Sequence, residues 1–126
     1  METALYGSEG FYSTTGRAGR RGDFITSPEV GPLFGHVLSR AIDAVWKRLG
    51  EPSGFQIVEV GAGPGTLARS ILAAEPQCLV NGTYVAVELS AEQRALHPDA
   101  VTSTGVMPSN IEHGVIIANE MLDNLP

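Results

Sequence analysis

Apolar residues recur at helical spacing over residues 28–49. Their spacing of three and four residues predicts an amphipathic helix that ends at Gly50 and buries its apolar side in the core. Ser27 followed by Pro28 is typical of a helix start, and Gly31-Pro32 allows a start one turn later. The apolar positions of this helix are Val30, Leu33, Phe34, Val37, Leu38, Ala41, Ile42, Val45, Trp46 and Leu49.

Short apolar runs rich in β-branched residues predict buried strands. Three such runs occupy residues 57–60, 83–87 and 115–118. Residues 100–106 predict a weaker strand, because Gly105 interrupts the run. We therefore expect four strands, of which three are well defined by their pattern.

Helical segments separate the predicted strands. One runs for about two turns from Thr66 and is stopped by Pro76. A second begins after Ser90, which forms a capping box with Gln93, and Pro98 closes it early. The alternation predicts an α/β fold with a mostly parallel sheet, in which ligands bind beyond the carboxyl ends of the strands.

Three glycines at alternate positions follow the first predicted strand at once. Glycine tolerates positive φ and lets a ligand lie against the backbone, and the start of the next helix offers N–H groups to an anion. The G-x-G-x-G spacing differs from the G-x-G-x-x-G of dinucleotide-binding proteins and resembles the S-adenosylmethionine (SAM) loop of class I methyltransferases. A tight turn without a ligand is the alternative. The cofactor-binding candidates at this turn are Glu59, Gly61, Ala62, Gly63 and Gly65.

Acidic and amide side chains follow two other predicted strands. Glu88 ends the second strand, where a carboxylate can accept hydrogen bonds from both ribose hydroxyls of an adenosine cofactor. Asn119, Glu120 and Asp123 follow the last strand, where they can orient an amine or guanidinium or take its proton. The plainer alternatives are an exposed strand-end acid for Glu88 and a helix cap with a solvated acid for the other three.

Composition narrows the function classes. The chain has 126 residues, 43% hydrophobic and 17% charged, as in one soluble globular domain. Residues 1–49 carry six basic and five acidic side chains, and residues 50–126 carry two and nine, which disfavours binding to a nucleic-acid backbone. A single cysteine, Cys78, excludes an intrachain disulfide. No targeting signal or membrane segment is visible, so we expect a cytoplasmic protein.

Residues 6–27 predict a loop, because they hold five of the fifteen glycines and show no period. A solvated arm, an RNA-binding segment and an arm that folds over the active site are the alternatives for its three arginines. We therefore divide the chain into an arm over residues 1–27 and a folded part over residues 28–126. His36 has no companion at metal-ligand spacing, so we predict no metal site.

Three segments together resemble the signatures of one family. The family is that of the SAM-dependent methyltransferases that include the mitochondrial complex I assembly methyltransferase and bacterial MidA-like proteins. The resemblance implies a Rossmann-like class I fold, SAM as cofactor and a protein substrate, which is an arginine side chain in the mitochondrial branch. It also implies cofactor contacts from Asp23 and Thr26. The three segments are Gly19–Glu29, Val58–Leu67 and Ala118–Pro126.

The chain departs from the family pattern in two ways. An acidic residue is common in the helix after the glycines, where Ala68-Arg69-Ser70 stand here. Family members also continue past Pro126, so we expect a fold truncated after the fourth strand, with little activity of its own. Its last strand would leave an open apolar edge through which the chain can self-associate. A non-catalytic binding module and an NAD(P)-linked oxidoreductase are the alternative functions.

Overall fold

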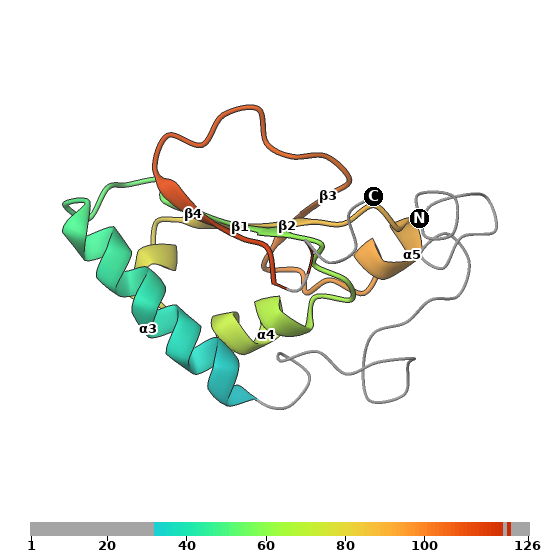
Figure 1. Ribbon diagram of the computed structural model, residues 1–126, viewed down its shortest axis with the longest axis horizontal. Helices are drawn as coiled ribbons and strands as arrows, with labels where there is room; N and C mark the ends of the chain where they lie inside the picture. The colour runs from blue at the N-terminus through green and yellow to red at the C-terminus, as the bar shows by residue number, and fades with distance from the viewer. Residues whose placement is uncertain (1–31, 120, 122–126) are drawn as a thin grey trace.

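A parallel four-stranded sheet forms the centre of the molecule in the computed structural model, which describes residues 32–119 and 121 (Figure 1). The strand order is β3-β2-β1-β4, so the strand before the glycines is flanked on both sides. The predicted parallel sheet is confirmed. The strands are β1 Gln56–Val60, β2 Thr83–Val87, β3 Thr102–Thr104 and β4 Gly114–Ile117.

The register aligns the carboxyl ends of the strands. Val58 of β1 lies opposite Val85 of β2 and Ile116 of β4. The weak strand predicted over residues 100–106 is present but is only three residues long. Its side chains are partly or fully exposed at the sheet edge, so β3 lacks the burial that sustains a longer strand.

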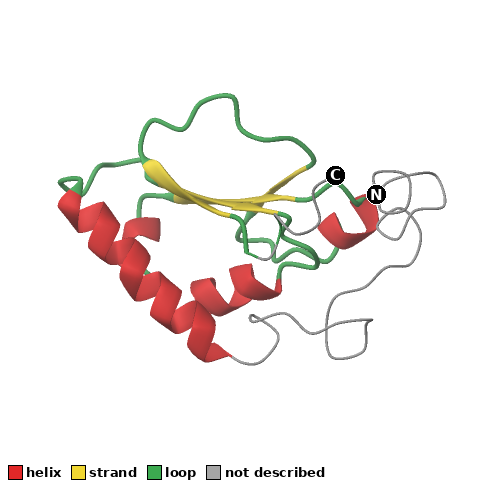
Figure 2. Ribbon diagram, viewed as in Figure 1, coloured by secondary structure: helices red, strands yellow, loops and turns green. Residues whose placement is uncertain are grey.

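Helices α3 and α4 cover one face of the sheet, whereas a long loop between β3 and β4 passes over the other (Figures 1 and 2). The predicted starts at Thr66 and after Ser90 are confirmed, and the Ser90 hydroxyl accepts the Gln93 N–H as a cap. The predicted arm and the helix start at Ser27 lie outside the described residues. The helices are α3 Pro32–Arg48, α4 Thr66–Ala73, the 3₁₀ turn η1 Gln77–Leu79 and α5 Ala91–Arg94.

The sequence pattern did not indicate η1, because a residue of another helix fixes this turn. The carboxylate of Asp43 in α3 accepts the N–H groups of Gln77 and Cys78 at 3.0 and 2.9 Å. A bond between residues that lie so far apart in the chain leaves no local signature. Along the described residues, no helix has the length and apolar character that a membrane crossing requires.

The core has a part on each face of the sheet. The larger part joins Ile57 and Tyr84 of the sheet to Leu67 and Ile71 of α4 and Ile42 of α3. The smaller part, on the opposite face, contains Val58, Val85 and Val87. Each buried Leu, Ile or Val side chain contributes about 1.5–3 kcal/mol relative to exposure, so these residues hold β1 in place.

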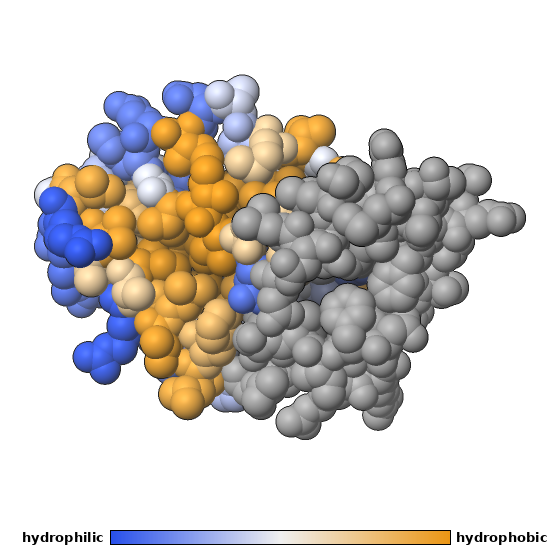
Figure 3. Space-filling model, in the orientation of Figure 1, coloured by the Kyte–Doolittle hydropathy of each residue, from blue (hydrophilic) through white to orange (hydrophobic). Residues whose placement is uncertain are grey.

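The prediction that α3 buries its whole apolar side is wrong. Phe34, Leu38, Ile42 and Trp46 pack on the core at every fourth position, but three others are exposed, as are the alanines between them. The helix instead approaches α4 through Gly35 and Ser39, both buried, so its contact is narrow. Apolar surface therefore remains visible across the centre of the described part (Figure 3). The exposed large residues of the predicted side are Leu33, Val37 and Leu49.

Candidate functional site

The loop Gly61–Gly65, here called the glycine loop, joins β1 to α4. Gly61, Gly63 and Gly65 have φ angles of +72°, +54° and +79°, which side chains rarely adopt, so the predicted need for glycine is confirmed at all three. The N–H groups of Gly61 and Ala62 donate to the carbonyl of Val87, at the end of β2. The loop is therefore tied to the neighbouring strand.

Glu88 lies beside this loop and is half-buried. Its Oε2 accepts the Gly63 N–H at 2.9 Å, and its Oε1 accepts the Ser90 N–H at 2.9 Å. The glycine loop and Glu88 therefore meet at one edge of the sheet. Its contact with a ribose stays a prediction, and the structure adds a second task, because the same carboxylate joins the loop to the start of α5.

Glu59 occupies the interior of the sheet rather than its rim. Its residue is 5% exposed, and Oε2 accepts the Tyr84 hydroxyl at 2.7 Å. The pKa of the Glu59 carboxyl is raised to about 7, because burial and, to a smaller extent, the charge of Glu88 raise it more than the Tyr84 hydrogen bond lowers it. Burial and the Glu59 charge likewise raise the pKa of Tyr84. The structure thus gives Glu59 a partner in the core, and its contact with the cofactor stays a prediction.

Two basic side chains brace the glycine loop, one from α4 and one from the segment after α5, and sequence reasoning missed both. His97 Nε2 lies 2.8 Å from the Gly63 carbonyl oxygen, and its Nδ1 lies 2.8 Å from Ser103 Oγ. Arg69 donates to the carbonyls of Pro64 at 2.8 Å and Leu96 at 2.6 Å. His97 is remote from the loop in the sequence, and the pairing of β2 with β3 brings it there. Arg69 follows the loop directly in α4, but no pattern in the sequence indicates which carbonyls its guanidinium binds.

The segment after β4 also returns to the glycine loop. A Cβ on Gly61 would lie 3.6 Å from the Met121 side chain, so Met121 contacts the loop. Asn119, two residues after β4, is half-buried. The predicted positions Glu120 and Asp123 lie outside the described residues, as do Asp23 and Thr26. Of the three residues predicted to orient the methyl acceptor, the structure therefore describes only Asn119.

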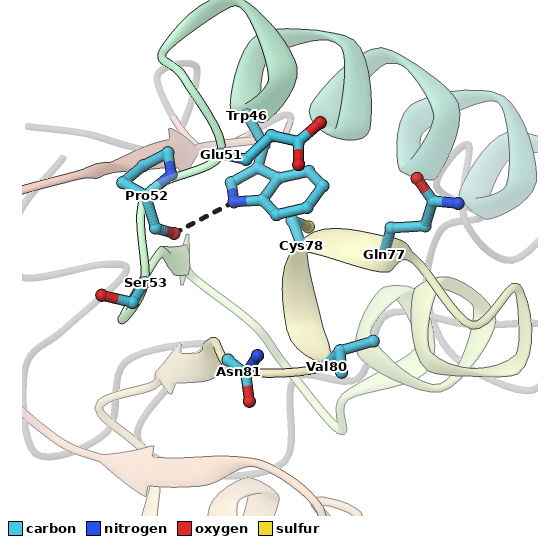
Figure 4. A pocket seen from close by; sticks show the side chains of 8 residues that line it. All are labelled: Trp46, Glu51, Pro52, Ser53, Gln77, Cys78, Val80 and Asn81. Carbon is cyan, nitrogen blue, oxygen red and sulfur yellow. Dashed lines mark hydrogen bonds between the residues drawn. The ribbon is translucent and has the colours of Figure 1, made fainter.

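A hollow lies at the opposite end of the strands from the glycine loop (Figure 4). It has a volume of about 300 Å³ and lies among α3, η1 and the turn before β1, and Trp46 Nε1 donates to the Pro52 carbonyl beside it at 3.0 Å. Cys78 lines it, but burial, with the neighbouring Asp43, raises the pKa of this thiol to about 12, so it is unreactive. This hollow is remote from the glycine loop and is not the candidate site.

No metal site is present among the residues that the structure describes, where no group of three or more metal-ligating side chains occurs. His36, the histidine that we weighed as a ligand, is exposed on α3. Its Nδ1 lies 2.9 Å from the carbonyl oxygen of Pro32, one turn earlier in the same helix. His36 is therefore a surface residue of α3.

Relatives with curated names match about half of the chain. The chain is 48% identical over 63 residues to "Protein arginine methyltransferase NDUFAF7 homolog, mitochondrial" of Drosophila melanogaster, which covers 50% of this chain and 14% of the fly protein. It is 42% identical over 65 residues to the Homo sapiens protein arginine methyltransferase NDUFAF7, mitochondrial, covering 52% of this chain and 15% of that protein. The matched part is thus a small share of these relatives.

A solved structure and a family model extend the likeness to most of the chain. A COG1565 superfamily member from Burkholderia thailandensis, bound to S-adenosyl-homocysteine, is 32% identical with a TM-score of 0.80, over 99% of this chain and 36% of that one. The family described as "Putative S-adenosyl-L-methionine-dependent methyltransferase" matches residues 37–126. The predicted fold, enzyme class and cofactor are confirmed at the level of the family. The family match favours a SAM-dependent methyltransferase over the alternative of an NAD(P)-linked oxidoreductase. The chain belongs to this family of SAM-dependent methyltransferases.

Proposed function

We propose that this chain is the cofactor-binding part of a class I SAM-dependent methyltransferase that acts on a protein side chain. The observation that carries the proposal is the hydrogen bond from the Gly63 N–H to Glu88, which joins the glycine loop to the end of β2. A carboxylate and a backbone without side chains then lie at the same sheet edge, where parallel α/β sheets bind ligands. The protein arginine methyltransferases among the relatives support an arginine side chain as the acceptor.

The residues of this edge fit SAM in their chemistry. The three glycines leave the backbone of the loop open to the methionine part of the cofactor, and the first turn of α4 supplies N–H groups for its carboxylate. Each oxygen of Glu88 accepts one backbone N–H and retains a lone pair for a ribose hydroxyl. When bound, SAM supplies an electrophilic methyl group.

The acceptor side of the site falls to the segment after β4. We assign to Asn119, Glu120 and Asp123 the task of orienting the acceptor nitrogen and receiving its proton, because carboxylates pair well with an amine or guanidinium. Direct transfer between two bound reactants needs positioning and exclusion of water more than covalent help from the protein. A cytoplasmic location stays a prediction, and the two relatives are named mitochondrial.

Calorimetry tests the cofactor assignment. Titration of the chain with S-adenosyl-homocysteine should give saturable binding, and titration with NADH should give none, because the glycine spacing lacks the extra residue of dinucleotide loops. Titration of each ligand into buffer is the control. Saturable NADH binding without a signal from S-adenosyl-homocysteine would reject the proposal.

A non-catalytic binding module is the second candidate function. The outer edge of β4 favours it, because in the described part of the chain β4 pairs with β1 alone and Ile116 is 58% exposed. Such an edge can add a strand from another chain. The two candidates differ in the calorimetric titration with S-adenosyl-homocysteine, because only the first requires the chain to bind the cofactor.

A further inference from the structure

We propose that His97, together with Arg69, is a positioning residue that fixes the glycine loop in its ligand-receiving conformation before the cofactor binds. The inference rests on the proposed function, since it concerns the same loop. Both residues lie outside the glycine loop: Arg69 belongs to α4, and His97 lies between α5 and β3.

The hydrogen bonds of His97 fix its tautomer. The Gly63 carbonyl oxygen can only accept, so the Nε2 that lies 2.8 Å away must carry the proton. In a neutral imidazole Nδ1 is then an acceptor, and the Ser103 hydroxyl, also at 2.8 Å, donates to it. The Gly63 carbonyl therefore selects the Nε2–H tautomer, and the Ser103 hydroxyl of β3 stabilises it by donating to Nδ1.

Arg69 takes the next carbonyl of the same loop. Its guanidinium donates through one nitrogen to Pro64 and through the other to Leu96, the residue before His97. Two successive carbonyls, of Gly63 and Pro64, are thus held by side chains, while Glu88 holds the Gly63 N–H. The orientation of the peptide groups in the loop is set from both sides.

The same segment also limits the space around the loop. A Cβ on Gly65 would lie 3.1 Å from the His97 ring and 3.2 Å from Pro98. A Cβ on Gly63 would lie 3.2 Å from Gln93. The loop therefore lies against α5 and the segment that follows it.

These contacts matter because glycine is the most flexible residue in an unfolded or unrestrained chain. If the three-glycine loop became ordered only on binding, the conformational entropy that it loses would weaken cofactor affinity. Hydrogen bonds that order the loop before the cofactor binds remove this loss from the binding step. Arg69 stands where we expected an acidic residue, so its cationic fork is available for the carbonyls. The clasp formed by His97, Ser103 and Arg69 is thus a device for cofactor affinity.

Two substitutions at one position test the role of the donor. His97→Leu removes the donor to Gly63, and we expect it to weaken the binding of S-adenosyl-homocysteine about three- to tenfold, the range for one lost hydrogen bond. His97→Gln keeps an N–H donor near the position of Nε2 and should stay within about twofold of the wild type. His113→Leu, at the exposed histidine before β4, is the control and should change nothing.

Affinity that is equal in His97→Leu and the wild type would overturn the proposal. So would a folded His97→Gln that binds as weakly as His97→Leu, because that result would make the ring itself, and not its donor, the essential part. Should His97→Leu fail to fold, Ser103→Ala provides the test. It removes only the hydroxyl on Nδ1, and we expect affinity to fall about two- to threefold.

Measurements on the cofactor-free chain separate this inference from the proposed function. Nitrogen-15 NMR of the imidazole should show His97 in the Nε2–H tautomer, and Ser103→Ala should allow a mixture. Amide exchange at Gly63 and Gly65 should be faster in His97→Leu than in the wild type. If the wild type binds no S-adenosyl-homocysteine, the proposed function fails, and these two readouts still decide the inference. An Nδ1–H tautomer in the wild type, or unchanged exchange, would refute it.

Discussion

The carboxylate of Glu88 accepts the N–H of Gly63 at 2.9 Å, so the residue that we expect to hold a ribose also holds the glycine loop. We expect Glu88→Ala to weaken the binding of S-adenosyl-homocysteine by about 1.5–3 kcal/mol, the range for hydrogen bonds to a charged group. Glu88→Gln, which retains one acceptor oxygen, should lose less. Calorimetry on the folded variants measures both.

A ligand that lacks the 2′-hydroxyl separates the two tasks of Glu88. If Glu88 contacts the ribose, removal of this hydroxyl should weaken binding to the wild type and have little effect on Glu88→Ala, as in a double-mutant cycle. If the wild type and Glu88→Ala lose the same affinity, Glu88 does not contact the 2′-hydroxyl and only braces the glycine loop.

The buried Glu59–Tyr84 pair gives the chain a pH-dependent stability. The pKa of Glu59 is about 7 in the folded chain and 4.5 in the unfolded chain, so the folded state binds the proton of this carboxyl more tightly. Protonated Glu59 therefore stabilises the fold fully below about pH 4.5, and this contribution is lost as the pH rises through 7. The free energy of unfolding changes by about 3 kcal/mol over this range.

Glu59→Gln tests this effect, because the amide oxygen can still accept the Tyr84 hydroxyl but cannot ionise. The free energy of unfolding of the variant, relative to the wild type, should increase between pH 5 and 8. Urea titrations at each pH measure this difference, and Glu112→Gln, at an exposed position, is the control. A difference that does not depend on pH would contradict the prediction.

Gly35 sets the distance between α3 and α4. A Cβ at this position would overlap the Ser70 side chain and lie 2.9 Å from its backbone carbon. Gly35→Ala gains about 1 kcal/mol in helix propensity but forces the helices apart, which costs about 1–3 kcal/mol. We expect net destabilisation in urea unfolding. Ala44→Gly on the exposed side of α3 is the control for propensity alone, and a Gly35→Ala variant more stable than the wild type would disprove this account.

The outer edge of β4 predicts self-association. Ile116 is 58% exposed on the face opposite α3 and α4, and a charged side chain is a common means of blocking such an edge. Ile116→Lys should shift the chain towards the monomer in sedimentation experiments over a range of concentrations. Val80→Lys removes an apolar residue that is 79% exposed at the far end of the sheet and should leave association unchanged. Equal effects of both substitutions would indicate unspecific hydrophobic contact.

The sequence predicted those features that depend on neighbouring residues. The β-branched runs of β1 and β2 and the positive φ angles of the glycine loop follow from local chemistry, and the structure confirms them. The clasp of His97 could not be predicted, since it depends on the pairing of β3 with β2. The burial of α3 was predicted wrongly because periodicity marks the apolar side of a helix and does not tell how much of it a partner covers.

The position of β1 between β2 and β4 has a consequence for synthesis on the ribosome. β2 follows β1 after one helix, whereas β4 emerges only after α5 and β3. Translation proceeds at roughly 5–20 residues per second, so one hydrogen-bonding edge of β1 stays unpaired for a few seconds before β4 is made. Nascent chains on neighbouring ribosomes can pair through that edge, so a translational pause between Val87 and Gly114 should lower the yield of folded protein.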